Sequence, residues 1–341
     1  MLLSVIVPIY NEEKYIKRCI ETILAQDFPR EEMEVVFVDG MSTDKTREIV
    51  LGYVEKYNHL SLLDNVKRTA PCAMNIGIRA TTGELVMRLD GHSLYPTNYF
   101  SSIVLWHKKI PEALNVGGLC ITDVVDKNKI SMSIAKVMSD KFGVGNSKFR
   151  TGVGNVECIE VDTVPFGCYK REVFDLIGYY NEELTRSQDY EFNKRLRREG
   201  GKIYMIPNIH CTYIPRDNYQ DLCRNRYQTG YWVVKMGFIT GTLKNSSIRH
   251  FIPLIFVLSI IIPSIVGLLY PCMLNISIVV LLLYMIVMLF RSIVIKDKST
   301  TAYNILIAFS CLHFSYGLGS LIGVLNNIFK RERNKCISLK K

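Results

Sequence analysis

Short apolar runs alternate with amphipathic stretches through residues 3–89, and this alternation restricts the possible fold more than any other feature of the chain. The runs at 3–9, 33–38, 60–63 and 84–89 have the length and composition of buried β-strands. The stretches between them predict three helices. The first begins near Asn11, the second begins after Ser42–Asp44 and ends near Tyr57, and the third covers residues 70–80. Asn11 and Ser42–Asp44 are the expected N-caps of the first two. This order predicts an α/β fold whose mixed, mostly parallel sheet has helices on both faces.

Two of the predicted strands end in a carboxylate. Asp39 follows the second strand, Asp90 follows the fourth, and His92 comes two residues after Asp90. The carboxyl ends of parallel strands meet at the edge of a sheet where ligands bind. A carboxylate and an imidazole that converge on one point suit a divalent cation such as Mn²⁺, and a plain polar turn is the alternative. The chain has neither a P-loop nor a Gly-x-Gly-x-x-Gly segment after its first strand, which argues against those two nucleotide sites.

The net charge and the cysteines indicate the kind of partner and the cellular compartment. A net charge of +10 indicates an anionic partner, namely a nucleotide diphosphate, anionic lipid or nucleic acid, unless the basic residues only flank membrane segments. The ten cysteines include no Cys-x-x-Cys pair, which favours reduced thiols in a cytosol. The first residues lack the basic region and cleavage site of a signal peptide, so we expect them to form the first strand.

The last third of the chain is dominated by apolar residues. Runs at 251–270, 273–295 and 303–329 are long enough to be membrane segments, and the step from Gly319 to Gly323 would allow helices to pack closely. Before them, residues 217–236 combine an aromatic face with basic flanks, which suits either a helix at a membrane surface or core packing against the preceding domain. Lys296 and Lys298 favour an inward-facing link. Three full spans would put the basic end outside, so we expect the third segment to be re-entrant or interfacial.

Several segments together carry a family resemblance. Residues 4–12, 38–46 and 90–92 resemble the motifs of family-2 glycosyltransferases with the GT-A fold, and His92 stands where that family usually has the second Asp of Asp-x-Asp. Residues 142–147, 161–178, 186–196 and 213–216 are similar to transferases that build succinoglycan-type exopolysaccharides. The resemblance covers roughly residues 2–240. The chain lacks the Gln-x-x-Arg-Trp signature of processive synthases, which favours transfer of one sugar per encounter.

The resemblance implies roles for individual residues. It points to a nucleotide site formed by five of them: Pro8, Glu12, Asp39, Arg68 and Asp90. The alternatives are that Glu12 only favours a helix start and that Arg68 is simply solvated.

The resemblance also implies a base and a metal site. It makes Asp189 the general base, with Glu191 second, and stabilisation of a helix start is the alternative for Asp189. Asp90 and His92 would bind the metal, with Mn²⁺ preferred over Mg²⁺ because of the imidazole. His210 is a further metal or diphosphate candidate, or a structural histidine.

Together, the motifs, the resemblance and the apolar segments predict a membrane-anchored, inverting, metal-dependent glycosyltransferase. It would transfer a sugar from a nucleotide sugar, expected to be a UDP-sugar, to a lipid-linked or polysaccharide acceptor in exopolysaccharide, capsule or cell-surface glycan synthesis. We expect membrane lipids but no nucleic acid as further partners, and a multi-pass protein of the cell membrane whose catalytic domain faces the cytoplasm. The alternatives are a non-catalytic nucleotide-sugar-binding component of polysaccharide assembly or export, and a nucleotidyltransferase.

The sequence also predicts the domain boundaries. We expect a catalytic domain at residues 1–216, an interfacial helix and linker at 217–247, two or three membrane segments within 248–329, and a basic tail at 330–341.

Overall fold

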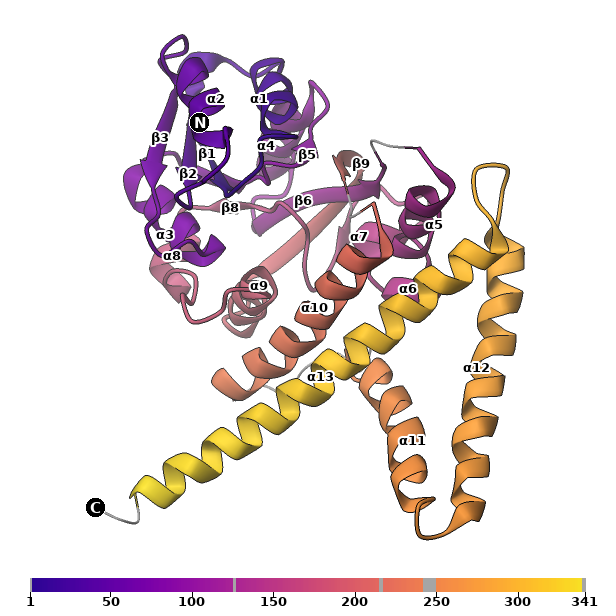
Figure 1. Cartoon of the computed structure of the whole chain (residues 1–341). Coiled ribbons are helices and arrows are strands. Elements are labelled where there is room, and N and C mark those ends of the chain that lie inside the picture. Colours follow the sequence, from indigo (N-terminus) through magenta and orange to yellow (C-terminus); the bar gives the residue numbers. More distant parts are fainter. Residues whose placement is uncertain (1, 125–126, 215–216, 242–249, 339–341) are drawn as a thin grey trace. The chain divides into compact units, whose positions relative to one another are not determined.

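The computed structural model of the chain describes residues 2–124, 127–214, 217–241 and 250–338, with side chains through residue 328 (Figure 1). The chain divides into two compact units, one formed by residues 1–122 and 147–214 and the other by residues 123–146 and 215–341. The second unit therefore includes a segment that is inserted into the sequence of the first.

The first unit is built on a nine-stranded sheet in which eight strands follow the order β3-β2-β1-β4-β8-β6-β9-β5 and β7 also pairs with β9. The strands are β1 (Leu3–Ile9), β2 (Met33–Asp39), β3 (Leu60–Asp64), β4 (Leu85–Arg88), β5 (Ser93–Leu94), β6 (Ala113–Thr122), β7 (Ile159–Glu160), β8 (Cys168–Lys170) and β9 (Lys202–Tyr213). Strands β1 to β4 are parallel, and β8 is antiparallel to both β4 and β6. Because β6 and β9 are parallel to each other, the carboxyl ends of β4, β6 and β9 lie at the same edge as those of β1 to β3.

Helices cover both faces of this sheet (Figure 1). They are α1 (Ile16–Leu24), α2 (Thr46–Val54), α3 (Ala70–Ala80), α4 (Tyr99–Lys109), α7 (Lys148–Thr151), α8 (Glu172–Ile177) and α9 (Gln188–Arg198). Residues of α1 and α4 share one hydrophobic core with Val5 and Val7 of β1, whereas α3, α8 and α9 share a second core with Ile6. The continuous apolar run of β1 is explained by this arrangement, because both of its faces are buried. The predicted α/β fold with a mixed, mostly parallel sheet is confirmed.

The prediction that Asn11 caps the first helix is wrong. Helix α1 begins only at Ile16, and its N-cap residue Tyr15 makes no side-chain cap. Asn11 instead has a positive φ of 54°, and its side-chain oxygen accepts a hydrogen bond from the backbone N–H of Thr43 at 2.8 Å. An Asn tolerates this left-handed conformation better than most residues. Its side chain therefore joins two loops at the edge of the sheet.

The second unit is helical. It contains α5 (Lys129–Met138), α6 (Lys141–Val144), α10 (Tyr219–Ile239), α11 (Ile252–Val266), α12 (Leu274–Ile295) and α13 (Ala302–Ser338). In the described part of the chain, residues 271–295 and 302–328 are long and apolar enough to cross a membrane, whereas α11 is shorter. The end of the expected linker, residues 242–247, and the end of the basic tail, residues 339–341, lie outside the described residues.

Close packing at the predicted glycine step is confirmed, and the partner helix is α10. A Cβ atom on Gly319 would lie 2.0 Å from the carbonyl oxygen of Tyr227, and one on Gly230 would lie 2.1 Å from that of Tyr316. Real Cβ atoms do not approach backbone atoms so closely, so only glycine allows the two helices to touch here. Gly323 continues the contact toward Tyr231 and Val234.

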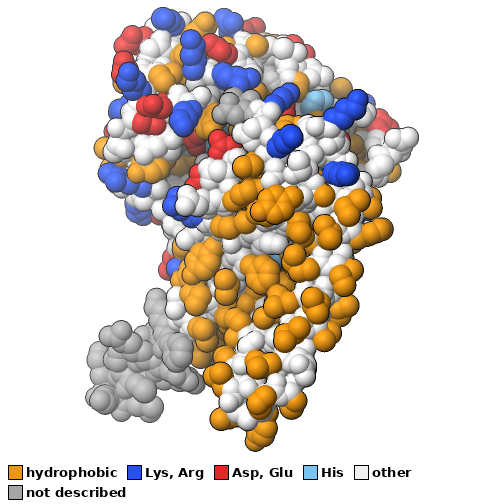
Figure 2. Space-filling model, turned by 45° about the vertical axis from the view of Figure 1, so that its right-hand side comes forward, with side chains coloured by type: hydrophobic (Ala, Val, Ile, Leu, Met, Phe, Trp, Pro, Cys, Tyr) orange, Lys and Arg blue, Asp and Glu red, His pale blue; other side chains and the backbone are white. Residues whose placement is uncertain are grey.

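Residues 127–146 of the inserted segment contact the long helices of their own unit. Arg291 of α12 forms an ion pair with the nearly buried Asp140, so the one charge within this apolar helix has an acidic partner. His313 of α13 contacts the carbonyl oxygen of Phe142 at 2.8 Å and the hydroxyl of Tyr284 at 3.1 Å. The outer surfaces of α11 and α12 remain apolar and exposed, and Figure 2 shows this concentration of hydrophobic side chains.

Candidate active site

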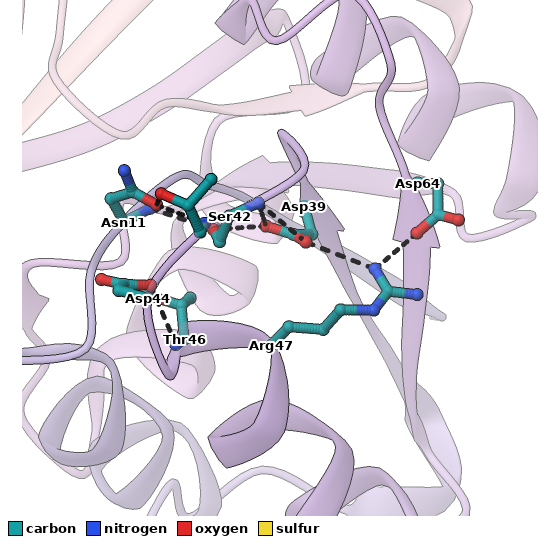
Figure 3. A network of polar contacts seen from close by, with 8 residues as sticks. Asn11, Asp39, Ser42, Asp44, Thr46, Arg47 and Asp64 are labelled. Carbon is teal, nitrogen blue, oxygen red and sulfur yellow. Dashed lines mark hydrogen bonds and ion pairs between the residues drawn. The ribbon is translucent and has the colours of Figure 1, made fainter.

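The loops after β1 and β2 are locked together around Asp39 at the carboxyl edge of the sheet (Figure 3). Asp39 is fully buried and accepts hydrogen bonds from the backbone and the hydroxyl of Ser42, the latter at 2.6 Å. Arg47 lies 3.3 Å from Asp39 and 2.6 Å from Asp64, so one guanidinium joins the ends of β2 and β3. Both oxygens of Asp39 already have protein donors. The observed contacts therefore make Asp39 the centre of a rigid loop rather than an exposed acceptor.

The other expected nucleoside contacts lie on the same edge. Pro8 is partly buried in β1, one residue before its end, and pairs with Val38 of β2. Arg68 is exposed on the loop between β3 and α3, where it has a positive φ of 57°. A non-glycine residue in this conformation is uncommon and is often found at functional sites. Pro8, Asp39 and Arg68 thus mark the part of the edge formed by β1, β2 and β3.

Arg88 brings together two carboxylates that are distant in sequence. Its guanidinium lies 3.0 Å from Asp90 and 3.8 Å from Asp189, which is near the start of α9. Burial acts to lower the pKa of Arg88, but the charges of Asp90 and Asp189 raise it, so this side chain stays protonated. The predicted base and the predicted metal ligand are therefore neighbours across one permanent positive charge.

His92 is oriented by Glu12. Its Nδ1 atom lies 2.9 Å from a carboxylate oxygen of Glu12, and its ring meets the ring of Tyr213 edge to face with centroids 5.6 Å apart. An ionised carboxylate can only accept, so Nδ1 carries the proton, and when the imidazole is neutral its lone pair lies on Nε2. This is the arrangement in which a carboxylate prepares a histidine to bind a metal ion. Glu12, expected at a ribose hydroxyl, is thus in contact with the expected metal ligand.

His210 is not brought into this group. It is exposed on β9, and successive side chains of a strand point to opposite faces, so it lies on the other face from Tyr213. Within the described residues no set of three or more His, Cys, Asp and Glu side chains could enclose a metal ion. One carboxylate and one imidazole still fit an ion that completes its shell with substrate phosphates and water, as Mg²⁺ and Mn²⁺ sites often do.

The surroundings of Asp189 and Glu191 distinguish the two candidate bases. The Asp189 side chain is 45% exposed, whereas that of Glu191 is 11% exposed. Two nitrogen atoms of Arg195 contact Glu191 at 3.1 Å each, and the same guanidinium donates to the carbonyl groups of Ile177 and Tyr179. Glu191 is engaged in holding α9 to the preceding loop. Of these two candidates, Asp189 is the one with a carboxylate open to a substrate hydroxyl.

Arg88 and Arg47 are site residues that were not predicted from the sequence. A signal for Arg88 was present, because a charged residue directly before the end of a buried strand needs a partner at the sheet edge. The partner Asp189 is 101 positions away, and no local pattern connects the two.

Comparison with known proteins links this edge to a family. A family model described as glycosyl transferase family 2 matches residues 4–162. A glucuronosyltransferase of Methanococcus voltae that is named for a dolichyl N-acetylglucosaminyl phosphate substrate is 30% identical over 67% of this chain and 71% of its own length. The succinoglycan biosynthesis protein ExoA of Rhizobium meliloti is 28% identical over 62% of this chain and 63% of its own length.

A solved structure has the same fold over nearly the whole chain. It is the mannosyltransferase of Pyrobaculum calidifontis in complex with GDP-mannose and Mn²⁺, with a TM-score of 0.57 and 19% identity over 96% of this chain and 87% of that one. At this identity the likeness shows the GT-A fold alone.

Proposed function

Because the chain belongs to glycosyltransferase family 2, we propose that it transfers a sugar from a nucleotide sugar to a lipid-linked or polysaccharide acceptor with inversion at the anomeric carbon. The proposed donor is a UDP-sugar. The observation that carries the proposal is the group formed by Arg88, Asp90 and Asp189, because it combines an open carboxylate with a candidate metal ligand at the sheet edge where nucleotides bind. The proposed catalytic part is residues 1–216.

In the proposed reaction, the acceptor hydroxyl loses its proton to Asp189 as it attacks the anomeric carbon. The bond from that carbon to the diphosphate breaks, and the nucleoside diphosphate leaves with the bonding electrons. Attack from the side opposite the leaving group inverts the configuration, which needs one base and no covalent enzyme intermediate. Arg88 would hold Asp189 in place, since its guanidinium lies 3.8 Å from that carboxylate.

A divalent ion would be held by Asp90 and His92, and it would neutralise the leaving diphosphate. Glu12 would fix the ring of His92 through the contact at 2.9 Å. Pro8, Arg68 and the loop around Asp39 would bind the nucleoside, and Asp39 would act by shaping that loop.

We also propose how the chain meets the membrane. Helix α12 has 22 residues and is roughly 33 Å long, which matches a hydrocarbon layer of about 30 Å. With α11 it would form a hairpin that crosses and returns, so that residues 250 and 296 both face the cytoplasm together with the catalytic unit. The surface residues of α12 are almost all apolar, whereas 44% of the most apolar stretch of α13 is buried within the protein. Helix α13 would accordingly lie at the membrane surface with α10.

Transfer of labelled sugar tests this function. Membranes that contain the full chain should convert a labelled nucleotide sugar into lipid-extractable or polymeric product, and a panel of UDP-sugars and GDP-sugars identifies the donor. The variant Asp90→Asn, measured beside the wild type, should bind the donor more weakly and transfer little sugar. A chain that binds a nucleotide sugar tightly but forms no product with any lipid or glycan acceptor would instead be a binding component of polysaccharide assembly.

A further inference from the structure

Arg150 lies at the same sheet edge as the candidate metal ligands but on a different element. It belongs to α7, and its guanidinium is 5.1 Å from the ring centroid of Tyr213 at the end of β9. Its Nη1 atom lies 3.4 Å from the hydroxyl of Thr122 at the end of β6. Thr122 and Tyr213 are register partners, and Tyr213 also pairs with Ser93, the residue after His92. Arg150 therefore sits above the carboxyl ends of β6 and β9.

One aromatic ring separates Arg150 from the metal motif. The centroid of the Tyr213 ring lies 5.1 Å from the guanidinium of Arg150 and 5.6 Å from the ring centroid of His92. An independent sign of closeness comes from the buried Cys120. Its pKa is lowered, chiefly by a hydrogen bond with Cys211, and Arg150, Asp90 and His92 all act on the same thiol. The Arg150 guanidinium, Asp90 and His92 are thus all close enough to act electrostatically on one buried thiol.

Arg150 differs from Arg47 and Arg88 in its partners. Arg47 and Arg88 are each engaged by two carboxylates. Within the part of the chain that the structure describes, the contacts of Arg150 are one hydroxyl and the rings of Phe149 and Tyr213, and no carboxylate lies within ion-pair distance. Aromatic packing orients a guanidinium without neutralising it. Arg150 therefore keeps its charge and most of its N–H donors available for an anion.

We propose that Arg150 binds the diphosphate of the nucleotide donor, a role that rests on the proposed function. The nucleoside end of the edge is marked by Arg68, which follows β3, three strands away from β4. The diphosphate would lie at the other end, beside Asp90 and His92. A guanidinium matches two phosphate oxygens at once, so it would stabilise the charge that develops as the diphosphate leaves.

The test compares ligands that do and do not carry the diphosphate, using the full chain in detergent with chelator present so that no metal contributes. In the variant Arg150→Met, affinity for UDP and for inorganic pyrophosphate should fall about 10- to 100-fold, the range expected for a lost charge-assisted contact. Affinity for uridine should be unchanged. Lys148→Met is the matched control, because it removes an exposed cation from the same helix and should alter none of these affinities.

The outcomes separate this inference from the proposed function. Unchanged UDP and pyrophosphate affinity in Arg150→Met would overturn the assignment, and a raised KM for a lipid-linked acceptor in that case would move Arg150 to an acceptor phosphate. Equal losses for UDP and uridine would also overturn it, since they would indicate a general disturbance of the site. Absence of UDP and GDP binding to the wild-type chain even after Mn²⁺ is added back would instead refute the proposed function. Arg150→Lys should recover part of the lost affinity, because it restores the charge but not the fork of donors.

Discussion

Exchanging the carboxylates of Asp189 and Glu191 for amides should separate catalysis from stability. Asp189→Asn keeps the shape of the side chain and removes the proton acceptor. We expect turnover to fall by at least ~10²-fold, the lower end of what general base catalysis contributes, which corresponds to roughly 2.7 kcal/mol in the barrier. Donor affinity should change little. Because the side chain is 45% exposed and lies 3.8 Å from Arg88, thermal stability should also change little.

Glu191→Gln should have the opposite effect. Its carboxylate is 11% exposed and accepts two contacts of 3.1 Å from Arg195, so replacing it weakens a charge-assisted, two-point interaction. Such a loss costs about 1–2 kcal/mol, which lowers the melting temperature of a unit of this size by roughly 2–8 °C. Turnover below that temperature should stay near that of the wild type.

The assays are initial rates of transfer from saturating labelled donor and thermal unfolding of the same preparations. Near-normal turnover in Asp189→Asn, together with an inactive Glu191→Gln protein that unfolds normally, would reverse the two roles. Equal loss of turnover in both variants, with equal loss of stability, would mean that α9 is needed only for the fold and that the base lies elsewhere.

Three further outcomes are expected. Chelator-treated membranes should recover more activity with Mn²⁺ than with Mg²⁺, and His92→Asp should shift this preference toward Mg²⁺; full activity in excess chelator would exclude a metal at this site. Burial lowers the pKa of His107 from 6.5 to about 4, so between these pH values His107 is protonated in the unfolded chain but not in the folded chain. The free energy of unfolding should therefore fall as the pH drops from 6.5 toward 4, by about 2 kcal/mol at pH 5. His107→Gln should lack this component in urea unfolding at several pH values. A reporter at the C-terminus should be active only on the cytoplasmic side, and labelling of Cys272 by a membrane-impermeant thiol reagent from outside should mark the tip of the hairpin.

The first four strands were predictable because their signal is local. Each of the first four is a short apolar run buried on one or both faces, and the predicted bounds differ from the observed ones by no more than one residue. The N-cap assignment of Asn11 failed for a reason that the local pattern does not contain. Its side chain is engaged by Thr43, 32 positions away, so a residue type that favours helix caps serves a contact between loops.

The site was predictable as a set of residues but not as a set of contacts. Spacing and resemblance indicated Glu12, His92 and Asp189, yet Glu12 was expected at a ribose. Its contact with His92 joins residues 80 positions apart and depends on where β1 and β4 end in the sheet. The link from Arg88 to Asp189 likewise arises only when α9 is placed beside β4. Pairing across a sheet edge is tertiary information, and periodicity reports only secondary structure.

The apolar length and the packing of α13 support different membrane placements. Residues 302–328 pass the length and composition criteria for crossing a bilayer. Their glycine face, however, is occupied by α10, and a Cβ atom at Gly319 would collide with the carbonyl oxygen of Tyr227. Helix α10 carries Arg224 and Arg226 close to that contact, and their burial in hydrocarbon would be costly. In the proposed topology, a helix packed so tightly against α10 would stay near the depth at which those charges meet water. Helix α12 differs from α13, because its exposed surface is apolar almost from end to end and its one arginine is paired with Asp140.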